Sequence, residues 1–565
     1  MPSVISEPAP PAAPRTASGV RRVDVAIVGA GPVGLTIANF LGMYGVSAVV
    51  IERGAELIDY PRGVGMDDEC LRAFQSIGLV DNVRPHTTPD QWVRFLTARG
   101  RCFASVEPRT REFGWPRRNA FIQPLVDREL LAGVSRYPHV EVLFGRTLSD
   151  LTETGDGVLL HVHDDAGAVE DIHARYVVGA DGGKSTVRKI LDIPFTGKTE
   201  STRWVVVDIR NDPIGIPDAY LYCVPARPYV SIALPHGIRR VEFMVFGEET
   251  EEQLCSTEGI EALLRIVMPF PERADVIRSR VYTHHARLAQ RFRQGRVLLA
   301  GDAAHLMPVW QGQGYNSGIR DATNISWKLA MVVKGLASDT LLGSYDLERR
   351  DHAAAMISIS VTAGKIFSPT RRWVALLRDG LTLLLNAIPS VKSYILQMRF
   401  KPMPRYTQGV VVQQVTEHAA GGSPVGRLFI QPDVRLKTGE TLKFDDAIGP
   451  WFAIVAWAVD PRLSMTEEVL AFWRKLGARF VTVMPAVQLS VEADAVLDDA
   501  LVLGDTGALK QWFGDHRASL VVLRPDRFVA ASAPTPQAID ELTVSLRAAM
   551  GADPIGRAEN RCAMR

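Results

Sequence analysis

The sequence predicts an α/β protein in which a Rossmann-type nucleotide-binding domain carries an inserted β-sheet domain, a helical linker region and a C-terminal domain. Three observations predict this architecture. A glycine-rich turn follows an apolar strand near the start of the chain, and a second apolar strand near its middle ends in a glycine and an aspartate. Between the two motifs lies a run of alternating β-type segments, which indicates the insertion.

The first motif is a strand, a tight turn and a helix start. Residues 25–28 are apolar and are followed by a G-x-G-x-x-G turn with Gly29, Gly31 and Gly34. The glycines allow the backbone to approach a pyrophosphate, and the helix N-terminus stabilises its charge. Glu52 ends the next strand 18 residues after Gly34, where an acid can accept the ribose hydroxyls. This motif predicts a dinucleotide site and leaves NAD and FAD both open.

The second motif favours a long ligand that contacts both ends of the domain. The apolar strand at residues 296–300 delivers Asp302 to the edge of a site, which favours a flavin dinucleotide. A second G-x-G-x-x-G, which would give a nicotinamide cofactor its own Rossmann domain, is missing from the sequence. Gly312 and Gly314, followed by Gly318, are the nearest match.

Composition limits the function classes. The chain has 565 residues, of which 47% are apolar and 22% charged, and its formal net charge is +1. This length suits two to four globular domains, and the charge gives no argument for binding nucleic acid or an anionic membrane. The cysteines have neither C-x-x-C nor metal-ligand spacing: Cys70, Cys102, Cys223, Cys255 and Cys562. We therefore expect a reduced, cytoplasmic enzyme without a metal.

The order of segments predicts the domain boundaries. A Pro/Ala/Ser-rich start is expected to be a disordered tail, and a Pro-rich break at residues 401–404 precedes the last domain. The predicted parts are residues 1–22 (tail), 23–195 (nucleotide-binding domain, first part), 196–290 (β-rich substrate domain), 291–400 (second part and helices) and 405–550 (C-terminal domain). Charged residues and a proline interrupt the apolar stretch 373–396, so a buried or interfacial helix pair is expected there rather than a membrane span.

Together the motifs resemble a known family. The two glycine motifs, with Ala180-Asp181-Gly182 between them and Pro308 after the second, resemble the single-component flavin-dependent aromatic hydroxylases typified by para-hydroxybenzoate hydroxylase and phenol hydroxylase. The resemblance covers about residues 23–400. Stretches 57–62, 113–124 and 307–318 are similar to the members that act on hydroxyphenylpropionates.

The resemblance implies a set of contacts to FAD. Pro308 would lie next to the flavin ring, and the helix start after Gly312 would place backbone amides near its pyrimidine end, where reduced flavin carries negative charge. Asp181 would touch both FAD and the passage for the nicotinamide cofactor. The implied FAD-binding residues are Gly29, Gly31, Gly34, Glu52, Arg53, Arg62, Gln123, Asp181, Asp302, Pro308, Gly312, Gly314, Tyr315 and Asn316.

The resemblance also implies the reaction. NADH or NADPH reduces FAD, O2 forms a flavin C4a-hydroperoxide, and a phenolic carboxylic acid is hydroxylated ortho to its hydroxyl, turning 3-(3-hydroxyphenyl)propionate or 3-hydroxycinnamate into the 2,3-dihydroxy product. Arg227 is the expected anchor for the substrate carboxylate, Tyr222 a contact to the phenol, and Trp310 a residue that shapes the pocket. His284 and His285 are expected to belong to a strand end or loop. No residue is assigned as the phenol base.

The C-terminal segment resembles the thioredoxin-like domain of phenol hydroxylase relatives. Without C-x-x-C it cannot carry out dithiol chemistry, so its expected role is structural, such as support of a homodimer.

Three alternatives share the flavin motifs. The protein could hydroxylate another phenol or a polyketide, or be a flavin-dependent epoxidase or oxidase. It could also be a flavin-binding sensor or partner-binding protein without catalysis, although the intact motifs weigh against this.

Overall fold

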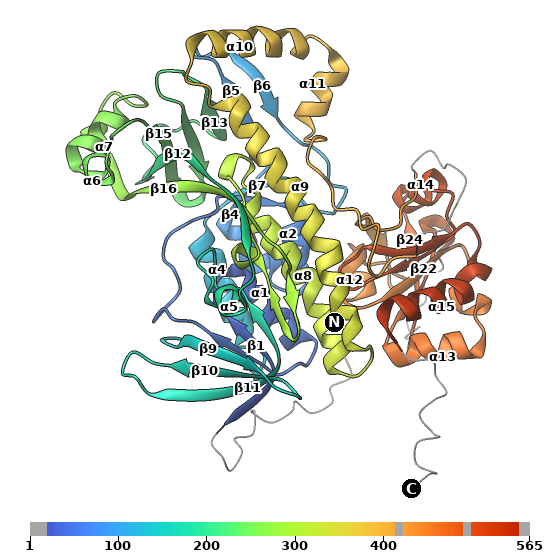
Figure 1. Cartoon of the computed structure of the whole chain (residues 1–565). Helices are drawn as coiled ribbons and strands as arrows, with labels where there is room; N and C mark the ends of the chain where they lie inside the picture. The colour runs from blue at the N-terminus through green and yellow to red at the C-terminus, as the bar shows by residue number, and fades with distance from the viewer. Residues whose placement is uncertain (1–19, 413–421, 490–498, 553–565) are drawn as a thin grey trace.

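The computed structural model describes residues 20–412, 422–489 and 499–552. In it, a nucleotide-binding domain and a second sheet are stacked, and a separate C-terminal domain packs against one side (Figure 1). The tail predicted for residues 1–22 lies outside the described residues except for its end, where β1 (Arg21–Val28) begins.

The first sheet combines strands from two distant parts of the chain. Its parallel strands are ordered β18-β11-β1-β2-β8. These strands are largely buried and apolar, as expected of a parallel sheet covered on both faces. Their bounds are Ala48–Ile51 (β2), Val140–Leu143 (β8), Val169–Gly179 (β11) and Val297–Leu299 (β18). The ends of β1 and β18, which carry the two motifs, lie on either side of the end of β11.

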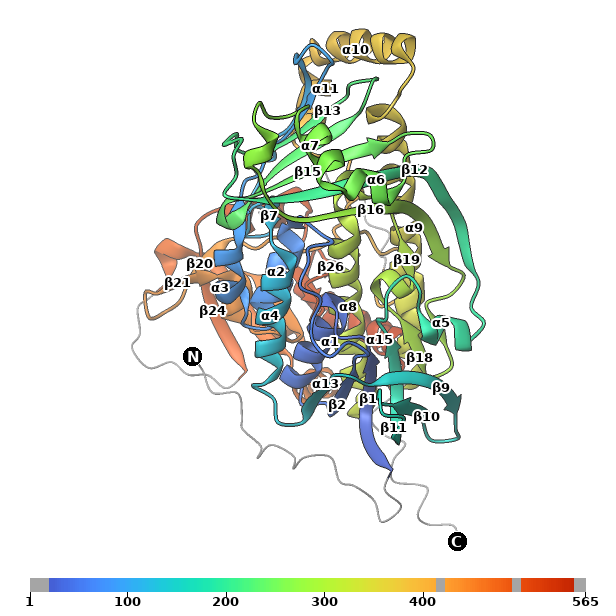
Figure 2. The same ribbon diagram turned by 90° about the vertical axis from the view of Figure 1, so that its left-hand side faces the viewer.

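The predicted insertion forms a second, eight-stranded sheet, ordered β19-β16-β12-β15-β14-β13-β5-β6. It lies between the nucleotide-binding domain and α10 (Figure 2). Its strands are β5 (Val93–Leu96), β6 (Cys102–Val106), β12 (Phe195–Arg210), β13 (Ala219–Tyr222), β14 (Tyr229–Leu234), β15 (Ile238–Val245), β16 (Asp275–Ala289) and β19 (His305–Leu306). The sheet therefore extends beyond residues 196–290, because β5 pairs in parallel with β13 and brings β6 with it.

Three helices matter for the site. They are α2 (Asp68–Ser76), α8 (Gln313–Val333) and α9 (Gly343–Phe367). Figure 1 shows α9 running from beneath α10 down past α8. Because α8 starts at Gln313, its N-terminus lies close in the chain to Gly301 and Asp302 of the second motif.

The apolar stretch after residue 372 forms two helices, α10 (Arg372–Asn386) and α11 (Pro389–Leu396), at one end of the molecule (Figure 1). The outer side of α10 is exposed and apolar, with Trp373 64% and Leu376 71% exposed. The helix pair is therefore not buried as a whole. Among the described helices, none alone has the length and apolar character to cross a membrane; α10 and α11 meet that test only as a pair, and they are bent by 106°.

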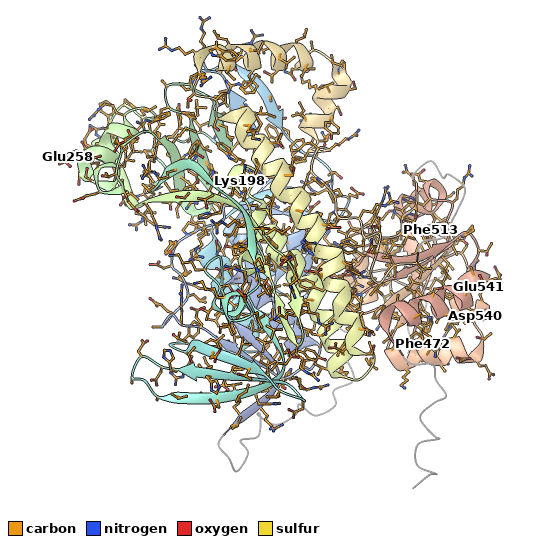
Figure 3. All side chains as sticks on the ribbon, viewed as in Figure 1. Lys198, Glu258, Phe472, Phe513, Asp540 and Glu541 are labelled. Carbon is orange, nitrogen blue, oxygen red and sulfur yellow. The ribbon has the colours of Figure 1, made fainter. Side chains whose placement is uncertain are left out.

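The C-terminal domain is distinct, with a seven-stranded mixed sheet ordered β21-β20-β24-β23-β22-β25-β26. Its strands are β20 (Asp433–Arg435), β21 (Thr441–Lys443), β22 (Ala453–Trp457), β23 (Arg479–Pro485), β24 (Ala500–Asp505), β25 (Leu520–Leu523) and β26 (Val529–Ala533). Phe472 of α13 (Glu467–Leu476) and Phe513 of α14 (Ala508–Asp515) belong to separate apolar clusters, and Figure 3 shows them apart in this domain.

Buried ion pairs join this domain to the helices of the nucleotide-binding domain. Arg524 donates to both carboxylate oxygens of Glu348 on α9, at 2.7 and 2.8 Å, and Lys328 on α8 donates to Glu348 at 2.8 Å. All three side chains are fully buried. Burial opposes ionisation of Glu348, but the charges of Arg524 and Lys328 hold its pKa at about 2. The contact between the C-terminal domain and helices α8 and α9 therefore depends on Glu348 keeping both of its cationic partners.

We predict that Arg524→Met destabilises the protein by about 3–5 kcal/mol, because it leaves the Glu348 carboxylate buried with less than its full set of partners. The measurement is urea unfolding followed by circular dichroism. Arg111→Met, which removes a partly exposed pair with Asp90, is the matched control and should stay within about 0.5 kcal/mol of wild type. Equal effects of the two changes would contradict the prediction.

Candidate active site

A cavity of about 1740 Å³ connects the two sequence motifs with the second sheet. At one end it is lined by the glycine turn and by Glu52 and Arg53 at the tip of β2. At the other end it opens into an apolar chamber beneath α9, α10 and α11, whose lining includes Phe95, Phe103, Leu221, Ile232, Phe367 and Met398. The expected long ligand would span this cavity.

The three motif glycines have different tasks. Gly29 has a φ of +108°, and a Cβ there would lie 2.5 Å from the carbonyl oxygen of Ala180. A Cβ on Gly34 would lie 2.0 Å from the carbonyl oxygen of Gly29, so both positions serve close backbone packing. A Cβ on Gly31 would meet no described atom within 4 Å, and this residue caps the start of α1 (Pro32–Met43). The open space at this helix N-terminus suits a pyrophosphate.

Glu52 is held at the tip of β2 by the backbone around it. Its carboxylate accepts hydrogen bonds from the amides of Ala30 and Gly54, both at 2.8 Å. This joins the acid to the glycine turn and orients it along the cavity wall, beside Arg53.

Gln123 shapes the loop that carries Arg62. Its side-chain oxygen accepts hydrogen bonds from the amides of Arg62 at 3.1 Å and Gly63 at 2.8 Å, while its Nε2 donates to Asp127 at 3.1 Å. Burial raises the pKa of Asp127 to about 7. Gln123 and Arg62 both line the cavity.

The Gly301-Asp302 turn is fixed from α8. Asp321 accepts a hydrogen bond from the Gly301 amide at 2.9 Å and from Arg349 at 2.8 Å, and its carboxylate lies 2.7 Å from Nε2 of His305. Burial opposes ionisation of Asp321, but His305 and Arg349 hold its pKa at about 2. Asp302 itself lines the cavity, and burial raises its pKa.

The start of α8 also faces the cavity. Gly312, with a φ of +62°, is the N-cap, and Gly314 and Tyr315 line the cavity beside it. Asn316 does not line the cavity; its amide donates to the carbonyl oxygens of Gly65 and Gly312, at 3.1 and 2.7 Å. The helix N-terminus can stabilise negative charge on a bound group.

Asp181 and Trp310 line the same cavity, whereas Pro308 lies between the lining residues Met307 and Val309 and is not itself part of the lining. Asp181 lines the cavity and accepts hydrogen bonds from the amides of Thr186 at 2.6 Å and Val187 at 3.1 Å. Pro308 caps the short turn Val309–Gln311. Trp310 lines the cavity and packs edge-on against Trp204, with ring centroids 5.2 Å apart.

Two expected substrate residues are not where the sequence placed them. Arg227 is already paired with Glu249, at 2.5 and 3.2 Å, and does not line the cavity. Tyr222 stacks on Tyr229 with ring centroids 4.2 Å apart, on the far face of its strand. Because side chains alternate along a strand, it is Leu221, the neighbour of Tyr222, that faces the chamber.

Sequence reasoning missed two polar groups in the cavity wall. Arg118 lines the cavity near Gly65, forms no ion pair among the described residues, and has a pKa lowered to about 10 by burial alone. His284 also lines the cavity and has no hydrogen-bond partner among the described residues. The sequence shows both residue types, but it does not show that Arg118 becomes half-buried without an ion pair or that His284 becomes buried without a hydrogen-bond partner.

We predict that Gly31→Ala folds normally but binds FAD about tenfold more weakly or worse, because a methyl group would occupy the open space at the helix start. FAD fluorescence quenching measures the affinity, and thermal unfolding the fold. Gly34→Ala should impair both, and Gly380→Ala, on exposed α10, neither. Unchanged FAD affinity in Gly31→Ala would contradict this assignment.

Comparison with known proteins agrees with this geometry. Residues 22–360 match the FAD binding domain family, and residues 426–549 match the HcaD C-terminal domain family. The open helix start at Gly31, the fixed Glu52 carboxylate and the second helix start at Gly312 fit the pyrophosphate, ribose and flavin of FAD. The protein is an FAD-binding monooxygenase.

Its relatives give a narrower family. A 3-(3-hydroxy-phenyl)propionate/3-hydroxycinnamic acid hydroxylase of Escherichia coli (strain SMS-3-5 / SECEC) is 55% identical over 529 residues, or 94% of this chain and 95% of the relative. The protein of the same name from Shigella sonnei (strain Ss046) is 56% identical over 512 residues, or 90% and 92%. The chain belongs to this family of FAD-dependent aromatic hydroxylases.

Solved structures share the fold. The flavin-dependent monooxygenase PieE in complex with FAD and substrate has a TM-score of 0.79 at 21% identity, over 94% of this chain and 99% of that one. A ternary complex of aklavinone-11 hydroxylase with FAD and aklavinone has a TM-score of 0.74 at 23% identity, with the same coverage.

Proposed function

We propose that this protein hydroxylates 3-(3-hydroxyphenyl)propionate and 3-hydroxycinnamate ortho to the phenolic hydroxyl, with O2 and NADH or NADPH as co-substrates. The observation that carries the proposal is the continuity of the cavity at the two flavin motifs with an apolar chamber of the second sheet. The names of relatives 55% identical to this chain supply the substrate class. Bound FAD supplies the oxygen-transfer chemistry.

The protein's own contribution is to hold the ring in a dry chamber. The aromatic and aliphatic side chains beneath α9, α10 and α11 exclude water, and the N-terminus of α8 stabilises negative charge beside Gly312. The nicotinamide cofactor, for which the sequence offers no second Rossmann motif, reaches the flavin past Asp181 without a domain of its own.

Arg118 is the anchor proposed for the substrate carboxylate in place of Arg227. Arg118 is half-buried and its Nε is enclosed; a guanidinium in such a place is costly without a counter-ion, and a carboxylate ligand would satisfy it with paired hydrogen bonds. Arg118 lines the cavity and lacks an ion pair among the described residues, whereas Arg227 is occupied by Glu249.

In the C-terminal domain β22, β23 and β24 run parallel, β25 runs antiparallel to β22, and β26 runs antiparallel to β25, which supports a thioredoxin-like arrangement. This domain has a structural role, such as support of a homodimer, and the enzyme works in the cytoplasm.

The test of the proposed reaction is NADH oxidation by the FAD-loaded protein with and without 3-(3-hydroxyphenyl)propionate, with the product identified by mass spectrometry. We expect strong stimulation and a product one oxygen heavier. Stimulation with hydrogen peroxide as the sole product would mean that the compound is an effector. No response from a protein with verified FAD would direct the search to other phenols or polyketides.

We predict that Arg118→Met weakens binding of 3-(3-hydroxyphenyl)propionate by about tenfold to a hundredfold, because a charge-assisted pair contributes about 1.5–3 kcal/mol. Binding of the uncharged analogue 3-ethylphenol should change little. Both are measured by perturbation of the flavin absorbance. Arg227→Met is the matched control and should leave both affinities unchanged. Weaker FAD binding in Arg118→Met, with unaltered substrate binding, would instead assign Arg118 to the flavin.

A further inference from the structure

The cavity wall contains two buried polar side chains that are unpaired within the described part of the chain. They are His284 on β16 and Trp204 on β12, neighbouring strands of the second sheet. Both line the cavity, and their exposed fractions are 2% and 1%. A buried polar group without a partner costs about 1–3 kcal/mol, so such groups in a cavity wall point to a ligand.

His284 is a neutral imidazole at neutral pH. Burial lowers its pKa to about 4, with the neighbouring His285 contributing to the decrease. A neutral imidazole has one nitrogen that accepts a hydrogen bond and one that donates. Neither ring nitrogen of His284 has a partner among the described residues.

Trp204 offers a donor beside this acceptor. Its indole ring is nearly parallel to the imidazole of His284, with an interplanar angle of 7° and ring centroids 6.2 Å apart. Nε1 of Trp204 can only donate, and it too lacks a partner in the described part of the structure. A donor and an acceptor therefore lie side by side in the cavity wall.

The polar groups around this pair are already engaged. The hydroxyl of Tyr282 donates to Glu242 at 2.7 Å, and Arg240 pairs with Asp208 at 2.8 Å. His285 contacts the hydroxyl of Thr199 at 3.1 Å. Because these neighbours already have partners, we expect the polar atoms of His284 and Trp204 to bind a ligand.

Trp310 connects the pair to the flavin side of the cavity. Its ring stands perpendicular to both, with centroid distances of 5.2 Å to Trp204 and 5.7 Å to His284. Trp310 follows Pro308 in the second motif, and a Cβ on Gly364 of α9 would lie 2.4 Å from its Nε1. Helix α9 thus holds Trp310 against the two rings.

We propose that His284 and Trp204 together bind the phenolic hydroxyl of the substrate: the hydroxyl donates to His284 and accepts from Trp204. A hydroxyl is the group that both donates and accepts, and this inference rests on the proposed function for the identity of the phenol. Binding of the hydroxyl beside Trp310, which belongs to the second motif, would fix the orientation of the ring relative to the flavin site. The hydrogen bond accepted by His284 also raises the electron density of the ring at the carbon adjacent to the hydroxyl.

The test is binding to oxidised, FAD-loaded protein, measured without turnover by perturbation of the flavin absorbance. The probes are 3-(3-hydroxyphenyl)propionate and 3-phenylpropionate, which lacks the hydroxyl. We expect wild type to prefer the hydroxylated acid by about a hundredfold or more, since a site built to bind a hydroxyl leaves its own polar groups unpaired without one. Equal affinities in wild type would overturn the proposal without any variant.

Variants assign the effect to the two side chains. His284→Phe keeps an aromatic ring but has no acceptor and should reduce the preference about tenfold or more. His284→Gln, whose amide oxygen accepts, should retain most of it. Trp204→Phe should also reduce it, and His285→Phe, the control, should not. Full preference retained in a folded, FAD-loaded His284→Phe would overturn the role of His284.

Product analysis separates this inference from the proposed function. In His284→Phe, loss of ring positioning should give peroxide or a second hydroxylated isomer at the expense of the 2,3-dihydroxy product. Wild type that prefers the hydroxylated acid but forms no hydroxylated product would overturn the proposed function and leave the binding inference standing. Wild type that forms the 2,3-dihydroxy product but binds the two acids equally would overturn the binding inference and leave the proposed function standing.

Discussion

Helix α8 depends on a row of buried charges, and a buried charge is stable in a protein only when it is paired. Arg320 pairs with Asp67 and with Glu69 on α2, Asp321 with Arg349 on α9, and Lys328 with Glu348, which Arg524 joins from the C-terminal domain. One helix thereby sets the positions of its neighbours and of the C-terminal domain. Through the Gly301 amide, Asp321 also fixes the turn that carries Asp302.

The paired charges of α8 contrast with several polar groups in the cavity wall that lack partners. Arg118, His284 and Trp204 line the cavity, and none has its polar groups fully satisfied by described residues. Because the buried charges of the central helix are paired within the protein, we infer that these unpaired groups serve a ligand. The cation Arg118 suits the carboxylate of a phenolic acid. The acceptor His284 and the donor Trp204 suit its hydroxyl.

The sequence predicts those parts of the site whose residues lie close together in the chain. Gly29, Gly31, Gly34 and Glu52 lie within one strand–turn–helix–strand unit, so their spacing specifies their geometry. The substrate wall is different. Tyr222 is predicted to contact the phenol, but strand alternation turns it away, because the face of β13 that lines the chamber is decided by pairing with β5, far along the chain. The unpaired state of His284 likewise exists only after β16 has packed beside β12 and Trp310.

The strand order has a consequence for how the protein is made. β11 takes its place between β1 and β18, so the sheet that carries both motifs combines the first strand of the domain with one that is synthesised much later. Contacts this far apart in the chain form slowly and only after a large loop has closed. A nascent chain therefore emerges with the glycine turn complete but without Asp302 or the start of α8. Stable binding of FAD therefore requires the second half of the domain to have been synthesised. FAD binding is then a late step of assembly, and FAD does not serve as a template for the folding of the first half.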